Sequence, residues 1–312
     1  MRRRVLGVVG ALVGLMCVGE VSASAGPVVR NGPIAFAGDR TGSFEIYRMR
    51  QDGSHVRRLT HTAAARASIF SDWSPDGRWI AFDSDRRGNV QLFVMNRNGG
   101  QVRQVTHNAQ FNGDPSFSPD GSRLVFEHGP NAGCCSNIYS IRLDGTGLRK
   151  LTHFTKETFA SEPEYSPDGR WIAFAKFPPG GSRSAIFVIR ANGGHLHRVT
   201  RQSLDAGHPS WSPDGRRIIF NDNFTQPVGD IFTIRPTGSG LTRLTFVEGR
   251  GQADYRPDYS PDGTKIVFNH IAGADQPPEV WVMRANGSGK HRISDPAVGA
   301  AFAPRWGPLP ED

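Results

Sequence analysis

The chain alternates short apolar runs with turn-forming segments, and the runs contain no regularly spaced polar positions. Trp79–Phe82 and Ile186–Ile189 are two examples, each with four apolar residues in succession. Such runs are typical of strands that are buried on both faces. The pattern therefore predicts short β-strands in the middle of covered sheets.

A tetrapeptide, Ser-Pro-Asp-Gly, separates successive runs and occurs five times at intervals of 44 to 48 residues. Its copies start at Ser74, Ser118, Ser166, Ser212 and Ser260. Proline suits the second position of a type I turn, aspartate the third, and glycine the left-handed position that closes the turn. We therefore expect hairpin turns here, and we interpret the repeated aspartates as turn formers and not as metal ligands.

A second repeated motif, Leu/Val-Thr, recurs in register with Ser-Pro-Asp-Gly and ends each unit. Its copies are Leu59-Thr60, Val105-Thr106, Leu151-Thr152, Val199-Thr200 and Leu244-Thr245, with Ile293-Ser294 as a weaker sixth. Each unit is expected to contain four strands, the fourth short and basic. Four-stranded antiparallel units repeated at this length predict the blades of a β-propeller.

The two ends of the chain supply parts of one unit. Pro33–Phe36 matches the second strand of the repeat, and Ala303–Trp306 matches the first. The fold class is thus all-β: a six-bladed propeller closed by the C-terminal strand joining the N-terminal blade. We expect one domain over residues 26–312, with blades near 31–60 plus 302–307, 69–106, 114–152, 162–200, 208–245 and 256–294.

The full unit, with an aromatic residue before Ser-Pro-Asp-Gly, then Ile-Ala-Phe and then Arg-Leu-Thr, resembles the TolB-type propeller repeat. The resemblance covers residues 26–312 and implies a binding role with a protein partner in the cell envelope. TolB itself carries an additional N-terminal domain before its propeller, and we expect no counterpart here, because only a few residues separate the predicted signal peptide from the first blade. The repeated residues build turns and core, so they say little about function.

Residues 1–25 have the layout of a secretory signal peptide. Arg2–Arg4 precede the apolar stretch Val5–Val18, and Ala23 and Ala25 stand at the −3 and −1 positions of a cleavage site. We expect export to the periplasm or the exterior, with no membrane span after cleavage. Cleavage lowers the formal net charge from +8 to +6. The basic residues are expected around the rim, which argues against nucleic-acid binding.

Cys134 and Cys135 are the two cysteines that remain after cleavage. Because they are adjacent, they are able to close an eight-membered disulfide ring that stiffens the loop. Our hypothesis is that this vicinal disulfide forms on export and contributes to a ligand-contacting surface.

Candidate ligand-binding residues lie where the sequence departs from the repeat. The residue before the strand proline is polar in four units, as Asp114, Glu162, His208 and Arg256. At a channel mouth such a set suits a metal ion, an anion or internal pairing, and pairing is favoured because buried polar groups need partners. The loops after the second strands lengthen from the third blade on and carry the further candidates His128, Asp222 and His270.

The sequence contains neither a Gly-x-Ser-x-Gly nor a His-Glu-x-x-His motif, which argues against serine hydrolases and zincins. We expect a monomeric, non-catalytic module, without a cofactor, that binds a protein, peptide or glycan. The alternative is a metal-dependent lyase that resembles oligogalacturonate lyase, in which His208 joins His128, His153 or His270 on a divalent cation.

Overall fold

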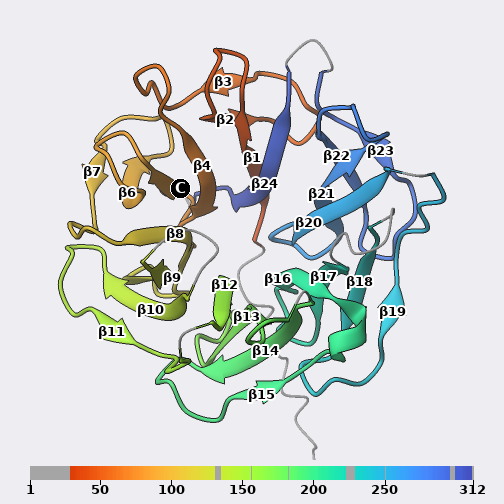
Figure 1. The fold of residues 1–312 in the computed structure, drawn as a ribbon. Coiled ribbons are helices and arrows are strands. Elements are labelled where there is room, and N and C mark those ends of the chain that lie inside the picture. Colours follow the sequence, from red (N-terminus) through yellow and green to blue (C-terminus); the bar gives the residue numbers. More distant parts are fainter. Residues whose placement is uncertain are drawn as a thin grey trace, which may run out of the picture.

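Six four-stranded antiparallel sheets surround one axis in the computed structural model of the chain (Figure 1). It describes residues 29–130, 135–155, 157–181, 183–222, 229–249, 251–295 and 299–310. The predicted signal peptide and Cys134 lie outside these residues. In the described part, no helix is both long enough and apolar enough to cross a bilayer.

The predicted six-bladed propeller is confirmed, with one sheet per blade. Blade 1 contains β24 (Ala301–Pro308), β1 (Asn31–Gly38), β2 (Glu45–Met49) and β3 (Arg57–Arg58). Blade 2 contains β4 (Ser68–Trp73), β5 (Trp79–Ser84), β6 (Gln91–Asn96) and β7 (Arg103–Gln104). Blade 3 contains β8 (Phe111–Phe117), β9 (Arg123–Gly129), β10 (Asn137–Arg142) and β11 (Arg149–Lys150).

The remaining blades follow in chain order. Blade 4 contains β12 (Phe159–Tyr165), β13 (Trp171–Phe177), β14 (Ala185–Arg190) and β15 (His197–Arg198). Blade 5 contains β16 (Ala206–Trp211), β17 (Ile218–Asp222), β18 (Ile231–Ile234) and β19 (Thr242–Arg243), and a 3₁₀ turn, η1 (Gln202–Leu204), precedes it. Blade 6 contains β20 (Ala253–Tyr259), β21 (Lys265–Ile271), β22 (Glu279–Arg284) and β23 (His291–Arg292).

The Ser-Pro-Asp-Gly segments form the turns between first and second strands. In blade 2, Ser74 Oγ donates to Asp76 Oδ1 over 2.5 Å and accepts the Trp79 N–H over 2.9 Å. Asp76 Oδ1 also accepts the Arg78 N–H over 3.0 Å. The same serine-to-aspartate bond recurs in the other four turns. These aspartates are therefore turn formers, as the sequence predicts.

The repeated threonine, or the serine in its place, ties the end of each blade to the beginning of its third strand. Thr60 Oγ1 accepts the Ile46 N–H over 2.9 Å, and the corresponding bond recurs in every blade. In blade 6 the acceptor is Ser294 Oγ. The weaker sixth copy of the motif, Ile293-Ser294, thus has the same structural role as the five Leu/Val-Thr copies.

Glycines in the second turns fix how closely neighbouring blades approach. Gly53 has φ +81°, and a Cβ added there would lie 1.9 Å from the carbonyl oxygen of Ile293 in blade 6. At the equivalent glycines of the other blades, an added Cβ would lie 2.6 to 3.0 Å from a backbone carbonyl oxygen of the preceding blade. Glycine is required here because both its φ and the space available exclude a side chain.

Closure joins the two ends of the chain, with β24 paired antiparallel to β1 (Figure 1). Trp306 is buried, and Gly307 packs so closely on Trp73 that an added Cβ would lie 2.4 Å from the ring. Leu309 N–H donates to the Arg30 carbonyl oxygen over 2.9 Å. The C-terminal strand therefore contacts two blades.

The expected lengthening of the second-to-third-strand loops is smaller than the sequence suggests. The connections are residues 39–44 and 85–90 in blades 1 and 2, and 130–136, 178–184, 223–230 and 272–278 in the others. They differ by only one or two residues, because much of the extra sequence extends β9, β13 and β21. The mouth face is thus only slightly asymmetric in loop length.

Candidate functional site

Asp114, Glu162, His208 and Arg256 meet at one end of the central channel. Each lies at a β-bulge in the first strand of its blade, with φ between +49° and +56°, and a proline follows it. Ala303 in blade 1 has the same bulge, with φ +50°. The bulge is therefore part of the scaffold, and what varies between blades is the side chain that it presents.

The space between these residues is small. The cavity that they line together with Phe70 and Ala303 has a volume of about 30 Å³. That volume is roughly what one or two waters occupy. A cavity of this volume is too small for a sugar ring.

Glu162 is the centre of an ion-pair network. His208 Nε2 lies 2.7 Å from Glu162 Oε1, and the His208 backbone N–H donates to Glu162 Oε2 over 2.7 Å. Arg256 Nη2 lies 3.7 Å from Glu162 Oε1. Burial raises the pKa of Glu162, but His208 and Arg256 outweigh it and lower this pKa to about 2. Glu162 is therefore ionised, and these three residues are partners, in line with the internal-pairing alternative.

Asn221 fixes the other side of the imidazole. Its Oδ1 lies 2.9 Å from His208 Nδ1 and accepts the Arg256 N–H over 3.0 Å, while its Nδ2 donates to the Asp222 carbonyl oxygen. Both ring nitrogens of His208 thus face oxygen atoms, which only the imidazolium form satisfies together. Burial and the charge of Arg256 lower the pKa of His208, so this arrangement is weakened as pH rises.

Three further carboxyl groups adjoin Glu162. Asp114 N–H donates to Asp83 Oδ2 over 3.1 Å. Burial raises the pKa of Asp114 to about 7. Arg256 lowers this pKa, and the negative charges of Glu162 and Asp83 raise it further. Burial also raises the pKa of Asp83 to about 6 and that of Glu127 well above its ordinary value. Glu127 Oε1 is buried without a hydrogen-bond partner among the described residues.

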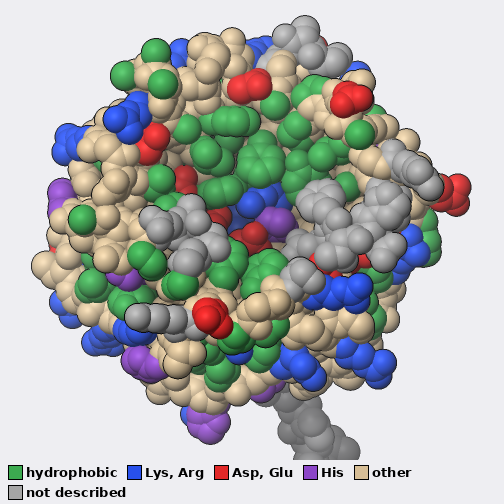
Figure 2. Space-filling view, in the orientation of Figure 1, with side chains coloured by type: hydrophobic (Ala, Val, Ile, Leu, Met, Phe, Trp, Pro, Cys, Tyr) green, Lys and Arg blue, Asp and Glu red, His purple; other side chains and the backbone are tan. Residues whose placement is uncertain are grey.

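Aromatic side chains border the mouth on one side. The guanidinium carbon of Arg256 lies 4.3 Å from the ring centre of Phe70 and 4.8 Å from that of Phe302. Phe44 and Tyr255 also pack near Phe302. Figure 2 shows acidic, basic and histidine side chains in a central hollow, with a broad hydrophobic area beside it. We call Phe44, Phe70 and Phe302, all partly exposed, the aromatic platform.

A second ring of charged residues lies two positions further along the first strands. Arg305 Nη1 donates to Glu164 Oε2 over 2.7 Å and to Asp258 Oδ1 over 3.3 Å. Burial raises the pKa of Asp72 to about 6 and that of Glu164 to about 7. Each of these carboxylates also accepts a backbone N–H from the next blade, at Phe117, Trp211 and Trp306.

Sequence reasoning missed this second ring and the Asp83, Asn221 and Asn269 contacts between blades. The signal for the ring was available, because the residue after the strand proline is Glu164, Asp258 or Arg305 in three blades. Asn269 Oδ1 accepts the Ala303 N–H over 2.8 Å, as Asn221 does for Arg256. Both asparagines lie at matching positions in their second strands.

The other candidates lie away from the mouth cavity. His128 bonds Asn112 and packs on Tyr139, and His270 bonds Asp254 and packs on Trp281. Asp222 ends β17, and burial raises its pKa to about 6. In the described part of the chain, no group of three His, Cys, Asp or Glu residues is arranged to hold a metal ion. The predicted Cys134–Cys135 disulfide involves a residue outside that part.

The sequence model of the TolB beta propeller domain matches residues 30–131 and 107–310. The chain belongs to the TolB β-propeller family. A search of curated protein sequences finds no match.

Solved TolB propellers share the fold of this family member at low sequence identity. TolB from Acinetobacter baumannii is 20% identical with a TM-score of 0.72, over 88% of this chain and 66% of that one, just under two thirds of its length. A chain from Agrobacterium tumefaciens assigned as TolB is 23% identical with a TM-score of 0.66, over 90% and 99%. An oligogalacturonate lyase in complex with manganese is 16% identical with a TM-score of 0.60, over 89% and 86%.

Proposed function

We propose that this chain is an exported TolB-like propeller that binds a segment of another protein at its channel mouth and catalyses no reaction. The bound segment presents a lysine or arginine side chain to the mouth carboxyl groups. An apolar side chain of the same segment lies on the aromatic platform.

The excess of carboxyl groups at the mouth is the observation that carries this proposal. Asp114 and Glu162 line the cavity and interact with the buried carboxyl groups of Asp83 and Glu127, and the cationic groups beside these four are Arg256, Arg305 and His208. A cationic side chain favours the ionised form of Asp114 and gains charge-assisted hydrogen bonds. The cavity of about 30 Å³ suits the head of such a side chain.

The aromatic platform supplies the apolar half of the site. The guanidinium of Arg256 lies over the adjacent rings of Phe70 and Phe302, so Arg256 is kept beside the mouth. Aromatic residues next to a charged pocket are typical of the few residues that dominate binding energy at protein interfaces. A partly exposed apolar surface of this kind is a common mark of an interaction site.

The basic, apolar and small-residue segments of residues 1–25 support export to the periplasm or the exterior. The expected mature chain begins at Gly26. Mass analysis of the N-terminal peptide after expression in a bacterium tests this part. A chain that keeps Met1–Ala25 in the exported fraction contradicts it.

A peptide library tests the binding site. The mature protein is used to select from random ten-residue peptides at pH 8, and we expect enrichment of peptides with lysine or arginine next to an apolar residue. The variant Asp114→Asn/Glu162→Gln should lose this enrichment. The matched control is Glu248→Gln/Asp275→Asn, which removes two exposed carboxyl groups from loops on the same face.

The aromatic platform is tested with the same selected peptides. Phe70→Ser should weaken their binding about tenfold or more, as loss of a dominant contact does. Phe246→Ser, which changes an exposed phenylalanine away from the mouth, should leave it unchanged. Selection of acidic peptides, or equal binding by the mouth variant and the control, would overturn the proposal.

A further inference from the structure

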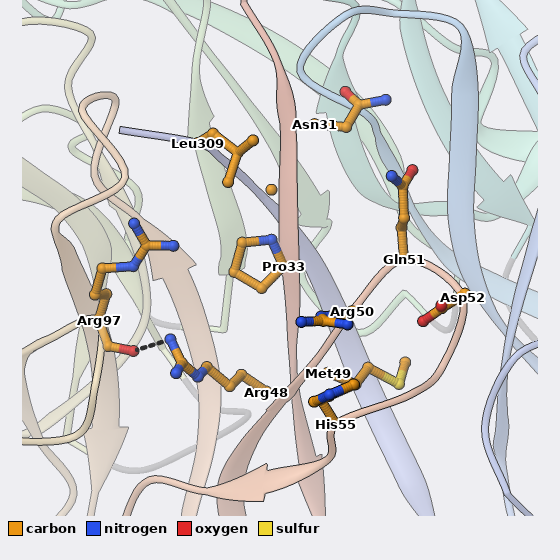
Figure 3. Close-up of a pocket in the computed structure, with 11 residues that line it drawn as sticks. Asn31, Pro33, Arg48, Met49, Arg50, Gln51, Asp52, His55, Arg97 and Leu309 are labelled. Atoms are coloured by element: carbon orange, nitrogen blue, oxygen red, sulfur yellow. Dashed lines mark hydrogen bonds between the residues drawn. The ribbon is translucent and has the colours of Figure 1, made fainter. Parts of the chain in front are cut away.

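A larger cavity lies at the opposite end of the strands, where the first blade closes. Its volume is about 410 Å³, within the range of small-molecule sites. We call it the seam pocket; its lining residues are Asn31–Pro33, Arg48–Asp52, His55, Arg97 and Leu309. Figure 3 shows Arg48, Arg50 and Arg97 around Pro33.

Ring closure accounts for the space. In the other five blades a Ser-Pro-Asp-Gly turn joins the first strand to the second, whereas in blade 1 the strands β24 and β1 come from different ends of the chain. Pro33 precedes the residue paired with Met49. Larger side chains hold this position in the other blades, namely Trp79, Arg123, Trp171, Arg217 and Lys265.

Arg48 and Arg97 break the internal repeat at this one boundary. Arg48 pairs with Ala35, at a position that is Val94, Ser140, Val188, Thr233 or Val282 in the other blades. Arg97 stands where the other blades have Gln51, Leu143, Ala191, Pro236 or Ala285. Two adjacent blades thus replace an uncharged residue by arginine, and both arginines line the seam pocket.

The three arginines of the pocket outnumber its acidic groups, because the described lining holds a single carboxylate, Asp52, whose pKa is lowered by hydrogen bonds from Ser54 and also by the charge of Arg50. Arg48 Nη1 donates to the Arg97 carbonyl oxygen over 3.1 Å, which holds its guanidinium at the pocket wall (Figure 3). No ion pair of Arg48, Arg50 or Arg97 occurs among the described residues. The one acidic lining residue, Asp52, accepts the Ser54 N–H of its own turn over 2.9 Å.

Apolar surface completes the lining. Pro33, Met49 and Leu309 also line the pocket, and Figure 3 shows Pro33 among the three arginines. An anion alone would contact the guanidinium groups but leave this apolar surface and most of the volume unused. The pocket therefore combines charges suited to an anion with a wall suited to a small organic group.

We propose that the seam pocket binds a small organic phosphate. A phosphate monoester carries close to two negative charges at pH 7 and three acceptor oxygens, which matches several forked guanidinium donors better than a single carboxylate does. The phosphoryl group would lie among Arg48, Arg50 and Arg97, and the organic group against Pro33 and Leu309. This site is independent of the channel mouth.

Calorimetric titration of the mature protein with phenyl phosphate, inorganic phosphate and benzoate tests the proposal at constant ionic strength. We expect saturable binding of one phenyl phosphate, weaker binding of inorganic phosphate and no binding of benzoate. Each titration is done with two forms of the chain, the parent and the variant Glu311→Gln/Asp312→Asn. The variant excludes competition for the site by the two acidic residues after Pro310. Saturable one-to-one binding of phenyl phosphate in either form supports the proposal.

The variant Arg48→Val/Arg97→Leu places there residues that blades 2 and 3 carry at the same positions, Val94 and Leu143, so it is expected to fold. It should bind phenyl phosphate at least tenfold more weakly. The matched control Arg142→Gln/Arg235→Gln removes two arginines from the ends of other third strands and should bind as the parent does. Thermal melting without ligand is recorded for each variant.

Three results would overturn the proposal. They are no saturable binding of phenyl phosphate in either form of the chain, benzoate binding as tight as phenyl phosphate, and equal loss of affinity in the arginine control. An equal loss of affinity in the arginine control would show that binding depends on net charge alone and not on the seam pocket. Binding at the channel mouth is unaffected by each of them.

Discussion

Glu162 accepts two hydrogen bonds from His208, one from ring Nε2 and one from the backbone N–H, each over 2.7 Å. These bonds span two neighbouring blades and, with Arg256, keep Glu162 ionised. Burial raises the pKa of Asp114 to about 7, and the negative charge of Glu162 contributes to this increase, so the protonated form of Asp114 is favoured. The mouth thus contains one carboxylate, Glu162, that is ionised at neutral pH because its pKa is about 2, and one, Asp114, whose pKa is about 7.

Asp114→Asn should change how stability depends on pH. The pKa of Asp114 in the folded protein, about 7, lies above its unfolded value of 3.8, so folding favours the protonated form. That contribution is complete below pH 4 and is lost as pH rises through 7. Asparagine cannot ionise and tolerates the positive φ. Chemical denaturation should find the variant more stable than the parent by about 4 kcal/mol at pH 8 and by less than about 1 kcal/mol at pH 4.

Asp275→Asn, in an exposed loop, serves as the control for this measurement and should follow the parent at every pH. If the Asp114→Asn and parent curves run parallel from pH 4 to 8, the raised pKa of Asp114 is wrong.

Gly53→Ala should destabilise the protein much more than Gly42→Ala. The two glycines have φ of +81° and +83°, so alanine meets the same backbone strain of about 1–2 kcal/mol at both. Only at Gly53 does the new Cβ meet the Ile293 carbonyl oxygen; nothing lies within 4 Å at Gly42. We expect the free energy of unfolding to fall by at least about 2 kcal/mol more for Gly53→Ala. Equal losses would show that blade spacing does not depend on this contact.

Removal of β24 should prevent cooperative folding. A chain ending at Ala300 lacks Trp306 and Arg305, and so loses both the strand paired with β1 and the cation shared by Glu164 and Asp258. Circular dichroism should show no thermal transition near that of the parent. A chain ending at Pro308 keeps β24 and should melt close to the parent. A cooperative transition at the parent Tm without β24 would contradict the closed ring.

Manganese should not stabilise the protein. Both ring nitrogens of His208 already face Glu162 and Asn221, and His128 and His270 lie away from the mouth cavity. We expect Tm to change by less than about 1 °C with either 1 mM Mn²⁺ or a chelator, because a ligand that does not bind the folded state leaves Tm unchanged. A bound equivalent of manganese that raises Tm, and that His208→Ala abolishes, would favour the lyase alternative.

Local sequence predicted the blades well because local chemistry determines their turns. Ser74 and Asp76 form the first turn through bonds that span at most five residues, and Thr60 closes a blade fourteen residues from Ile46. The contacts that build the mouth are of another kind. Glu162 and His208 are 46 residues apart, and Arg305 and Glu164 are 141 apart.

The sequence by itself determined the fold class, the number of blades, the closing strand and the four residues that face the mouth, because each follows from a repeated local pattern. Only the tertiary structure decided which of those residues pair, how narrow the channel mouth is, and that Arg48 and Arg97 line one pocket at the seam. Curvature of the whole ring sets those distances. Since every blade contributes to that curvature, no single repeat contains the information.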